Sequence, residues 1–233
     1  MMINLKNMNN YEIKQTNSPY CVILTGGEGI IEEKKSKFIA RVESVESEQA
    51  ALGLLEEEKK KYWDAKHHCS AWILAGSDGN LPVMRCSDDG EPSGTAGKPM
   101  LEVLKGNGLM NTAVVVTRYF GGTLLGTGGL IRAYTQAVQK GLEFCKTGWM
   151  RYGERMRLTT DYNGIGKVLY QLQAHALTPE SADYGAEVIL TVLVLEEEKQ
   201  RLEKALMECT NGQIGIDVLE RGYFVFRETK PEV

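Results

Sequence analysis

Long apolar stretches are missing from this sequence of 233 residues. No run approaches the roughly 18 consecutive apolar residues that a membrane-spanning helix needs. The first residues, MMINLKNMNNYEIKQTNSPY, also contain no apolar core of signal-peptide length. We therefore expect a cytoplasmic protein with no membrane partner.

The sequence also lacks paired cysteines. Its five cysteines are scattered and odd in number, and none forms a Cys-x-x-Cys motif. This pattern argues against a disulfide framework and a structural zinc site, and it is typical of a reducing compartment. We expect no bound metal and no cofactor. The cysteines are Cys21, Cys69, Cys86, Cys145 and Cys209.

An excess of positive charge is absent as well. The formal net charge is -4, whereas a protein that holds nucleic acid by charge alone is normally basic. Up to Gly153 the chain carries 18 Lys and Arg against 17 Asp and Glu, and after it 9 against 14. Any polyanion should therefore bind to the first part, and we expect no readout of a DNA sequence.

The chain is long enough for two modest domains. Hydrophobic residues make up 42% and charged residues 25%, as in average soluble proteins. Residues 1–18, rich in Asn and Met, predict a flexible N-terminal extension, with an extra edge strand as the alternative. The periodic pattern lapses around Thr147–Gly153. We therefore expect a first domain over residues 19–147 and a second over residues 154–228.

The first expected domain mixes strands and helices. Ser44 or Ser47 can cap a helix whose apolar residues recur at helical spacing. Ser77-Asp78-Gly79-Asn80 is a turn signal between two strands. Helices are expected after Ser47, from Pro99 and after Gly129. The expected strands are Tyr20–Leu24, Phe38–Val42, His68–Ala75, Leu81–Cys86 and Thr112–Phe120.

The second expected domain has the order strand, helix, strand, strand, helix, strand. This βαββαβ order is typical of the ferredoxin-like sandwich, so the whole chain is assigned to the α+β class. Both helices are amphipathic, as is needed to cover one face of a sheet. The expected strands are Arg155–Thr160, Leu177–Asp183, Ala186–Leu195 and Ile214–Phe226, and the expected helices are Gly164–Ala174 and Glu196–Cys209.

The densest polar segment is Ser87–Pro99, which precedes a helix and combines acids, hydroxyls and glycines. Its backbone N–H groups and side chains could hold a phosphate or carboxylate, or its acids a magnesium ion. The alternative is that these acids cap turns and a helix. Proline stands at two positions that a Walker A loop reserves for other residues, so the segment is not one. The candidate binding residues are Asp88, Asp89, Glu91, Ser93, Thr95 and Lys98.

A second candidate segment has five glycines between Gly121 and Gly129. A glycine loop between a strand and a helix lets a partner approach the backbone and directs the helix N-terminus at an anion. The alternative is that the glycines allow tight packing while an arginine pairs with Asp88 or Glu91. No G-x-G-x-x-G spacing occurs, so a dinucleotide is not expected. The candidate binding residues are Arg118, Tyr119, Gly121, Gly122, Gly128, Gly129 and Arg132, with Phe120 as a further stacking face.

His67 lies in the segment Ala65-Lys66-His67-His68-Cys69. Neighbouring residues of a strand point to opposite faces, so only His67 and Cys69 share one, and two ligands do not make a zinc site. His67 could be a general base if it met the acidic segment, or a structural histidine. The sequence contains no complete catalytic set of residues, so no catalytic residue is assigned.

Two long motifs, DDGEPSGTAGKP (Asp88–Pro99) and VVVTRYFGGTLLGTGGLIRAY (Val114–Tyr134), closely resemble the signature of the IMPACT N-terminal domain. The segments AKHHCSA (Ala65–Ala71) and SKFIA (Ser36–Ala40) fall where that family carries similar motifs. The acidic second half is similar to the small C-terminal domain of the bacterial branch, so the chain resembles the IMPACT/YigZ family over both parts.

This resemblance implies a first domain folded like the second domain of ribosomal small-subunit protein five, followed by a ferredoxin-like domain. It also implies a link to translation, because eukaryotic members regulate translation through protein contacts. For bacterial members nucleic acid binding is the usual proposal. The family's shared polar positions correspond here to His67, Asp88, Asp89, Glu91, Ser93, Thr95, Lys98, Arg118 and Arg132.

We therefore expect a non-enzymatic regulator that binds RNA, the ribosome or a translation-associated protein through the two polar loops. The RNA version requires one surface that carries Lys66, Lys98, Arg118, Tyr119 and Arg132. The alternative is a hydrolase-like enzyme acting on a phosphorylated or peptide substrate. It requires His67, Asp88 or Asp89, and Lys98 to converge on one cleft.

Overall fold

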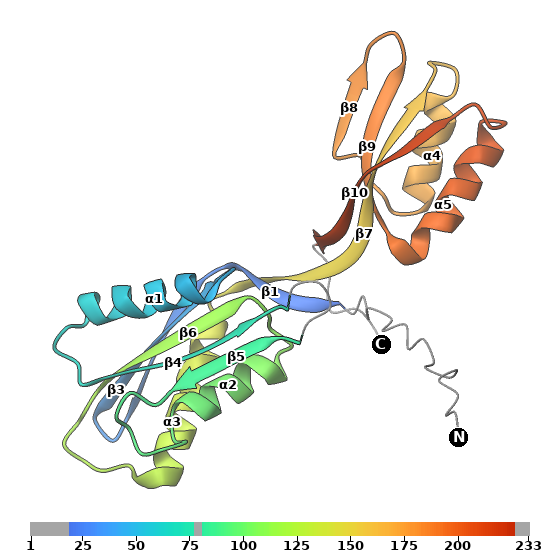
Figure 1. The fold of residues 1–233 in the computed structure, drawn as a ribbon. Coiled ribbons are helices and arrows are strands. Elements are labelled where there is room, and N and C mark those ends of the chain that lie inside the picture. Colours follow the sequence, from blue (N-terminus) through green and yellow to red (C-terminus); the bar gives the residue numbers. More distant parts are fainter. Residues whose placement is uncertain (1–18, 77–80, 227–233) are drawn as a thin grey trace, which may run out of the picture.

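Two five-stranded sheets, each covered by its own helices, organise the protein (Figure 1). This computed structural model describes residues 19–76 and 81–226. The expected α+β class with two domains is confirmed. The expected extension over residues 1–18 and the Ser77–Asn80 turn lie outside the described residues. No helix among the described residues has the length and apolarity to cross a membrane.

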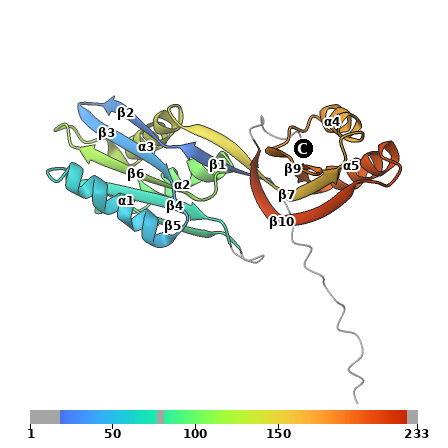
Figure 2. The same cartoon turned by 90° about the horizontal axis from the view of Figure 1, so that it is seen from above.

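The first sheet has the strand order β2-β3-β6-β4-β5, and every neighbouring pair is antiparallel. Helix α1 covers one face, while α2 and α3 cover the other (Figure 2). The strands are β2 (Gly27–Glu33), β3 (Ser36–Ser44), β4 (His67–Leu74), β5 (Val83–Ser87) and β6 (Thr112–Tyr119), and the helices are α1 (Glu48–Lys61), α2 (Gly97–Gly106) and α3 (Gly126–Leu142).

The central strands β4 and β6 are buried on both faces, and β6 confirms the strand expected at Thr112–Phe120. Cys69, Ala71 and Ile73 pack beneath α2 and α3, whereas Trp72 and Leu74 pack against α1. Side chains alternate along a strand, so a strand between two helical layers needs apolar residues at consecutive positions. Ser47 rather than Ser44 caps α1, because its hydroxyl accepts the backbone N–H of Ala50 at 3.1 Å.

Strand β2, with the sequence GEGIIEE, was not expected. Its glycines and charges read as a loop in isolation. The glycines instead allow the backbone of α3 to approach the sheet edge, because a Cβ atom on Gly29 would lie 2.4 Å from the amide nitrogen of Gly141. The close approach is a tertiary requirement, so local patterns did not reveal this strand.

The second domain confirms the ferredoxin-like βαββαβ order. Its strands lie in the order β10-β7-β9-β8, all antiparallel, with α4 and α5 packed on one face (Figure 1). Strand β8 begins at Ser181, later than expected, because the chain after α4 first folds back onto the helix end. The elements are β7 (Lys146–Thr160), α4 (Ile165–Ala174), β8 (Ser181–Tyr184), β9 (Val188–Leu195), α5 (Glu196–Cys209) and β10 (Gly215–Phe226).

Strand β7 is 15 residues long and runs from one domain into the other (Figure 1). The segment Thr147–Gly153, where the sequence suggested a boundary, lies inside this strand. Strand β1 (Tyr20–Thr25) pairs with the first residues of β7 and not with the first sheet. Tyr20 also contacts the ring of Tyr223 from β10, with centroids 5.1 Å apart. The two domains are therefore connected by strand pairing.

Candidate functional site

The acidic loop, Ser87–Gly97, is held in shape by its own first carboxylate. Asp88 accepts backbone N–H groups from Gly94 at 2.7 Å, Ala96 at 3.0 Å and Gly97 at 2.8 Å. Burial alone would raise the pKa of the Asp88 carboxyl, but these backbone donors hold its pKa below the ordinary value. Asp88 thus closes the loop and caps the start of α2, as the structural alternative expected.

Asp89 anchors the same loop to strand β4. Its carboxylate accepts the backbone N–H of His68 at 2.7 Å, and its carbonyl oxygen lies 2.8 Å from Nδ1 of His67. Because a carbonyl only accepts, Nδ1 is the protonated nitrogen of His67 and Nε2 is left for other contacts. Thr95 is buried and donates to the carbonyl of Pro92 at 2.6 Å, while Ser93 is exposed.

Glu91 and Arg118 form a buried ion pair between the acidic loop and β6. Nη1 of Arg118 donates to Oε1 of Glu91 at 2.6 Å, and the two side chains are 6% and 3% exposed. The hydroxyl of Tyr134 donates to the same oxygen at 2.8 Å. Nη2 of Arg118 lies 3.4 Å from Oγ of Ser36, and the thiol of Cys69 lies 3.3 Å from the hydroxyl of Tyr134.

Burial within this network keeps the Tyr134 hydroxyl and the Cys69 thiol protonated. Burial is the main reason that the pKa of the Tyr134 hydroxyl is raised far above its ordinary value. Burial likewise raises the pKa of the Cys69 thiol to about 12. Both groups remain neutral at physiological pH, so neither is poised as a nucleophile.

The glycine loop, Gly121–Gly129, lies against the turn between β2 and β3. The N–H of Gly121 donates to Ser36 at 3.1 Å, and a Cβ atom on Gly121 would lie 2.0 Å from the backbone of Lys35. Gly122 is exposed and has a φ of +83°. Helix α3 then begins at Gly126, without a side-chain N-cap, and Gly128 and Gly129 lie in its first turn.

The two loops enclose a cleft of about 430 Å³, here called the loop cleft. Arg118 and Glu91 lie at its base. His67, the first residue of β4, and Lys66, which precedes it, also line the cleft. Phe120 and Leu124 from the glycine loop are 50% and 84% exposed. The remaining lining residues are Pro92, Leu125, Gly126, Thr127 and Leu130.

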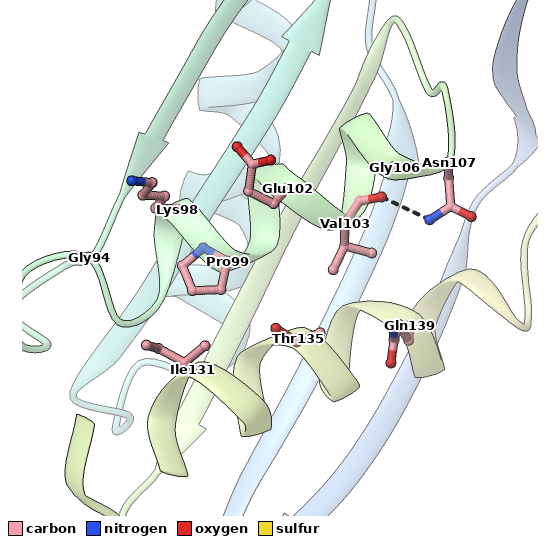
Figure 3. Close-up of a pocket in the computed structure, with 10 residues that line it drawn as sticks. All are labelled: Gly94, Lys98, Pro99, Glu102, Val103, Gly106, Asn107, Ile131, Thr135 and Gln139. Atoms are coloured by element: carbon pink, nitrogen blue, oxygen red, sulfur yellow. Dashed lines mark hydrogen bonds between the residues drawn. The ribbon is translucent and has the colours of Figure 1, made fainter. Parts of the chain in front are cut away.

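A second, larger hollow of about 710 Å³ lies between α2 and α3, and we call it the α2–α3 groove (Figure 3). Lys98 and Glu102 line it from α2, while Ile131 and Thr135 line it from α3. Lys98 therefore belongs to this groove and not to the loop cleft. Asn107 closes the end of α2 by donating to the carbonyl of Val103 at 2.8 Å.

The remaining candidates point elsewhere. Tyr119 is the neighbour of Arg118 on β6 and so projects from the opposite face of the sheet. Its hydroxyl donates to Asp64 at 2.6 Å, and this bond raises the pKa of Tyr119 to about 12. Arg132 is exposed on α3 and does not line the loop cleft.

The geometry therefore separates the residues that each hypothesis required together. The five side chains that the RNA version requires do not form one surface. Lys66 and Arg118 line the loop cleft, but Arg118 is buried in its ion pair, and Lys98 lies in the α2–α3 groove. Tyr119 projects from the opposite face of the sheet, and Arg132 is exposed on α3 outside the cleft. The residues required by the enzyme alternative do not converge on one cleft either. The carboxylates of Asp88 and Asp89 accept backbone N–H groups, and Lys98 lies in the α2–α3 groove. Among the described residues, no three His, Cys, Asp or Glu side chains are placed to hold a metal ion.

Two members of the buried network were not among the expected site residues. Ser36 joins Arg118 to the glycine loop, and Tyr134 joins Glu91 to Cys69. Tyr134 lies among the buried residues of α3. A buried tyrosine hydroxyl needs a partner, and this requirement is the signal that could have found it.

Two known domain families match this chain, one in each of its two domains. The Impact N-terminal domain matches residues 34–142, which contain both polar loops. A domain of unknown function matches residues 158–213, within the ferredoxin-like domain. The IMPACT family member YvyE of Bacillus subtilis is 38% identical over 204 residues, which cover 88% of this chain and 93% of YvyE. The chain belongs to the IMPACT family.

Two further comparisons support this membership. The IMPACT family member YigZ of Escherichia coli is 35% identical over 195 residues, covering 82% of this chain and 94% of YigZ. A crystal structure of a hypothetical protein is 32% identical, with a TM-score of 0.54, and the match covers 87% of this chain and 98% of that one. The family likeness therefore spans both domains.

Proposed function

We propose that this IMPACT family protein is a regulator associated with translation that acts by binding, and that the loop cleft of its first domain holds the partner. Family membership supports the link to translation, because the resemblance to eukaryotic members implies regulation through protein contacts. One observation carries the choice of site: both family motifs line the loop cleft, and Phe120 and Leu124 are exposed beside it. Exposed apolar side chains beside a cleft are typical of interaction sites.

A protein partner, either a translation factor or a protein of the ribosome, fits this site better than RNA. Arg118 is buried beside Glu91, so its guanidinium is not exposed to a phosphate of RNA. Tyr119 projects from the other face of the sheet, so among the described residues that line the cleft Phe120 is the one Phe, Tyr or Trp ring beside Arg118 on which an RNA base could stack. Phe120 and Leu124 make one side of the rim apolar, and aromatic and aliphatic anchors are what protein interfaces bury.

Binding to purified ribosomes and translation factors tests this proposal. We would compare Leu124→Asp in the glycine loop with Tyr170→Asp on α4, because these side chains are 84% and 69% exposed and neither is part of a core. We expect Leu124→Asp to weaken binding at least tenfold and Tyr170→Asp to leave it unchanged. A photocrosslinker at Leu124 should attach to a protein.

Three results would contradict the proposal in different ways. Loss of binding only with Tyr170→Asp would place the partner on the second domain. Crosslinks to RNA, with affinity that falls steeply with salt, would replace the protein partner by RNA. No binding to ribosomes or translation factors at low salt would remove the link to translation.

A further inference from the structure

The loop cleft has more positive than negative charge. Lys66 is exposed at its rim, and its side chain makes no ion pair or hydrogen bond within the described ranges. Arg118 adds a second positive charge, and among the described residues Glu91 is the one carboxylate that lines the cleft. Lys66, Arg118 and Glu91 together leave one net positive charge in the lining. A ligand with a single negative charge would balance it.

Helix α3 starts at the cleft and directs backbone N–H groups to it. Gly126 and Thr127, its first two residues, line the cleft, and the N-cap residue Leu125 has no polar side chain to cap this end. The first N–H groups of a helix have no partners within the helix, and the helix dipole makes this end positive. Gly128 lies in the same first turn, so its N–H is available in the same way.

A second observation at the same place is the incomplete pairing of Arg118. Its side chain is 6% exposed, and its Nε finds no hydrogen-bond partner among the described residues. Glu91 also accepts from Tyr134, so one carboxylate serves two donors. A buried guanidinium with an unused donor is costly unless further negative charge lies nearby.

The other walls of the cleft are apolar. Phe120, Leu124, Leu125 and Leu130 line one side, and Pro92 faces them from the acidic loop. A volume of about 430 Å³ is in the range of small-ligand pockets, and is large enough for one aromatic or branched side chain with its neighbouring carboxylate.

We propose that the loop cleft binds a carboxylate attached to an apolar group, with the carboxylate at the first turn of α3 beside Lys66 and the apolar group against Phe120 and Leu124. This inference rests on the proposed binding role of the same cleft. A phosphate monoester fits less well, because its charge of nearly two exceeds the net charge of the lining. The carboxylate can come from a peptide C-terminus, from an acidic side chain beside an apolar residue, or from a small organic acid.

A pair of small probes tests the carboxylate directly. N-acetyl-phenylalanine and N-acetyl-phenylalaninamide differ in the carboxylate, and both carry the same apolar ring. We would titrate each into the full chain labelled with ¹⁵N and follow the amide signals of Thr127, Gly128 and Gly129. The acid should bind with a dissociation constant of about 1 mM, as expected for a ligand of this size, and the amide at least tenfold more weakly. Equal binding of both probes, or stronger binding of inorganic phosphate, would overturn the inference.

Two variants localise the effect. Lys66→Gln removes the rim charge and should weaken binding of the acid about three- to tenfold. Lys98→Gln is the matched control, because Lys98 is also exposed but lines the α2–α3 groove, and it should change nothing. Thr127→Asp places a carboxylate at the helix start, where it favours the fold but competes with the ligand, so binding should fall more than tenfold. Equal effects of Lys66→Gln and Lys98→Gln would contradict the assigned site.

Peptides separate the sources of the carboxylate and keep this inference distinct from the proposed function. A peptide ending in Phe with a free C-terminus, its amidated form, and an amidated peptide with an internal Asp-Phe pair would be compared with the small acid. If these ligands fail while the ribosomal or factor partner still binds at Leu124, the carboxylate inference alone is wrong. If the acid binds but no translation partner does, the proposed function alone is wrong.

Discussion

The two domains of this protein bury polar groups in different ways. The first domain places the Glu91–Arg118 pair, Ser36 and the hydroxyl of Tyr134 beneath the loop cleft. The second domain has a large apolar core, and most of its ion pairs among the described residues lie near the surface, such as Arg155 with Glu180 at 2.8 Å. The nearest counterpart in the second domain is Glu154, which is buried and pairs with the partly buried Lys199 and with the exposed Arg221.

The contrast shows that buried polar pairs can fix the conformation of a site, whereas an apolar core mainly stabilises the fold. An apolar core stabilises the second domain without specifying a particular loop conformation, because the hydrophobic effect is not directional. The buried ions of the first domain are individually costly, yet their hydrogen bonds fix where the acidic and glycine loops meet. We expect the first domain to depend on pairs of residues and the second on buried volume.

Glu91→Gln should give the largest effect, because it leaves the buried guanidinium of Arg118 without a counter-charge. We expect the free energy of unfolding of the first domain to fall by about 3–5 kcal/mol. Urea unfolding followed by tryptophan fluorescence measures this, since Trp63 and Trp72 belong to the first domain and Trp149 packs against its core from β7. The double variant Glu91→Met/Arg118→Met should recover much of the loss. A loss below about 1 kcal/mol for the single variant would mean that the pair does not hold the domain together.

Leu206→Ala tests the volume argument in the second domain. Leu206 is fully buried on α5, so its truncation leaves a cavity and should lower stability by about 2–5 kcal/mol. Hydrogen exchange of the α4 and α5 amides would report the loss, with Met207→Ala as the exposed control. If tryptophan fluorescence shows an equal loss in the first domain, the shared strand β7 couples the two domains and the comparison must be revised.

Asp88→Asn tests how the acidic loop is held. A neutral side chain should accept the three N–H groups less well and cost about 1–2 kcal/mol at pH 7. Because the pKa of Asp88 is lowered in the folded protein, its contribution is present above the pKa of the unfolded chain, about 4, and is lost as pH falls through the folded pKa. The difference between the wild type and Asp88→Asn should therefore shrink on acidification below about pH 4. A difference that stays constant in urea unfolding from pH 6 to pH 2 would contradict this role.

Arg155→Gln should have the smallest effect, although Arg155 pairs with both Glu180 and Glu220. Its side chain is 33% exposed, so solvent screens these pairs and we expect a loss below about 1 kcal/mol. The loss should decrease further in high salt. Thermal unfolding followed by far-UV circular dichroism at two salt concentrations would measure it. An effect as large as that of Glu91→Gln would remove the distinction between buried and surface pairs.

Much of the fold followed from local patterns. The βαββαβ order of the second domain, the helix after Ser47 and the strand near residue 114 each depend on periodicities within a few residues. Strand β2 and the path of β7 could not be predicted from local patterns. Their glycines and partly polar sequences lack strand periodicity, and their partners lie far away in the sequence. The position of both polar loops was predictable, but the side chains that line the cleft between them were only partly so.

The sequence by itself determined the α+β class, the two polar loops and the membership of a family. The tertiary structure decided the state of Arg118, for which the sequence left open a ligand, Asp88 or Glu91, by pairing it with Glu91, 27 positions away. It also separated Lys98 and Tyr119 from the cleft and joined β1 to β7. The physical reason is that helix and strand periodicity is local, whereas pairing of buried charges and of strands depends on contacts between distant parts of the chain.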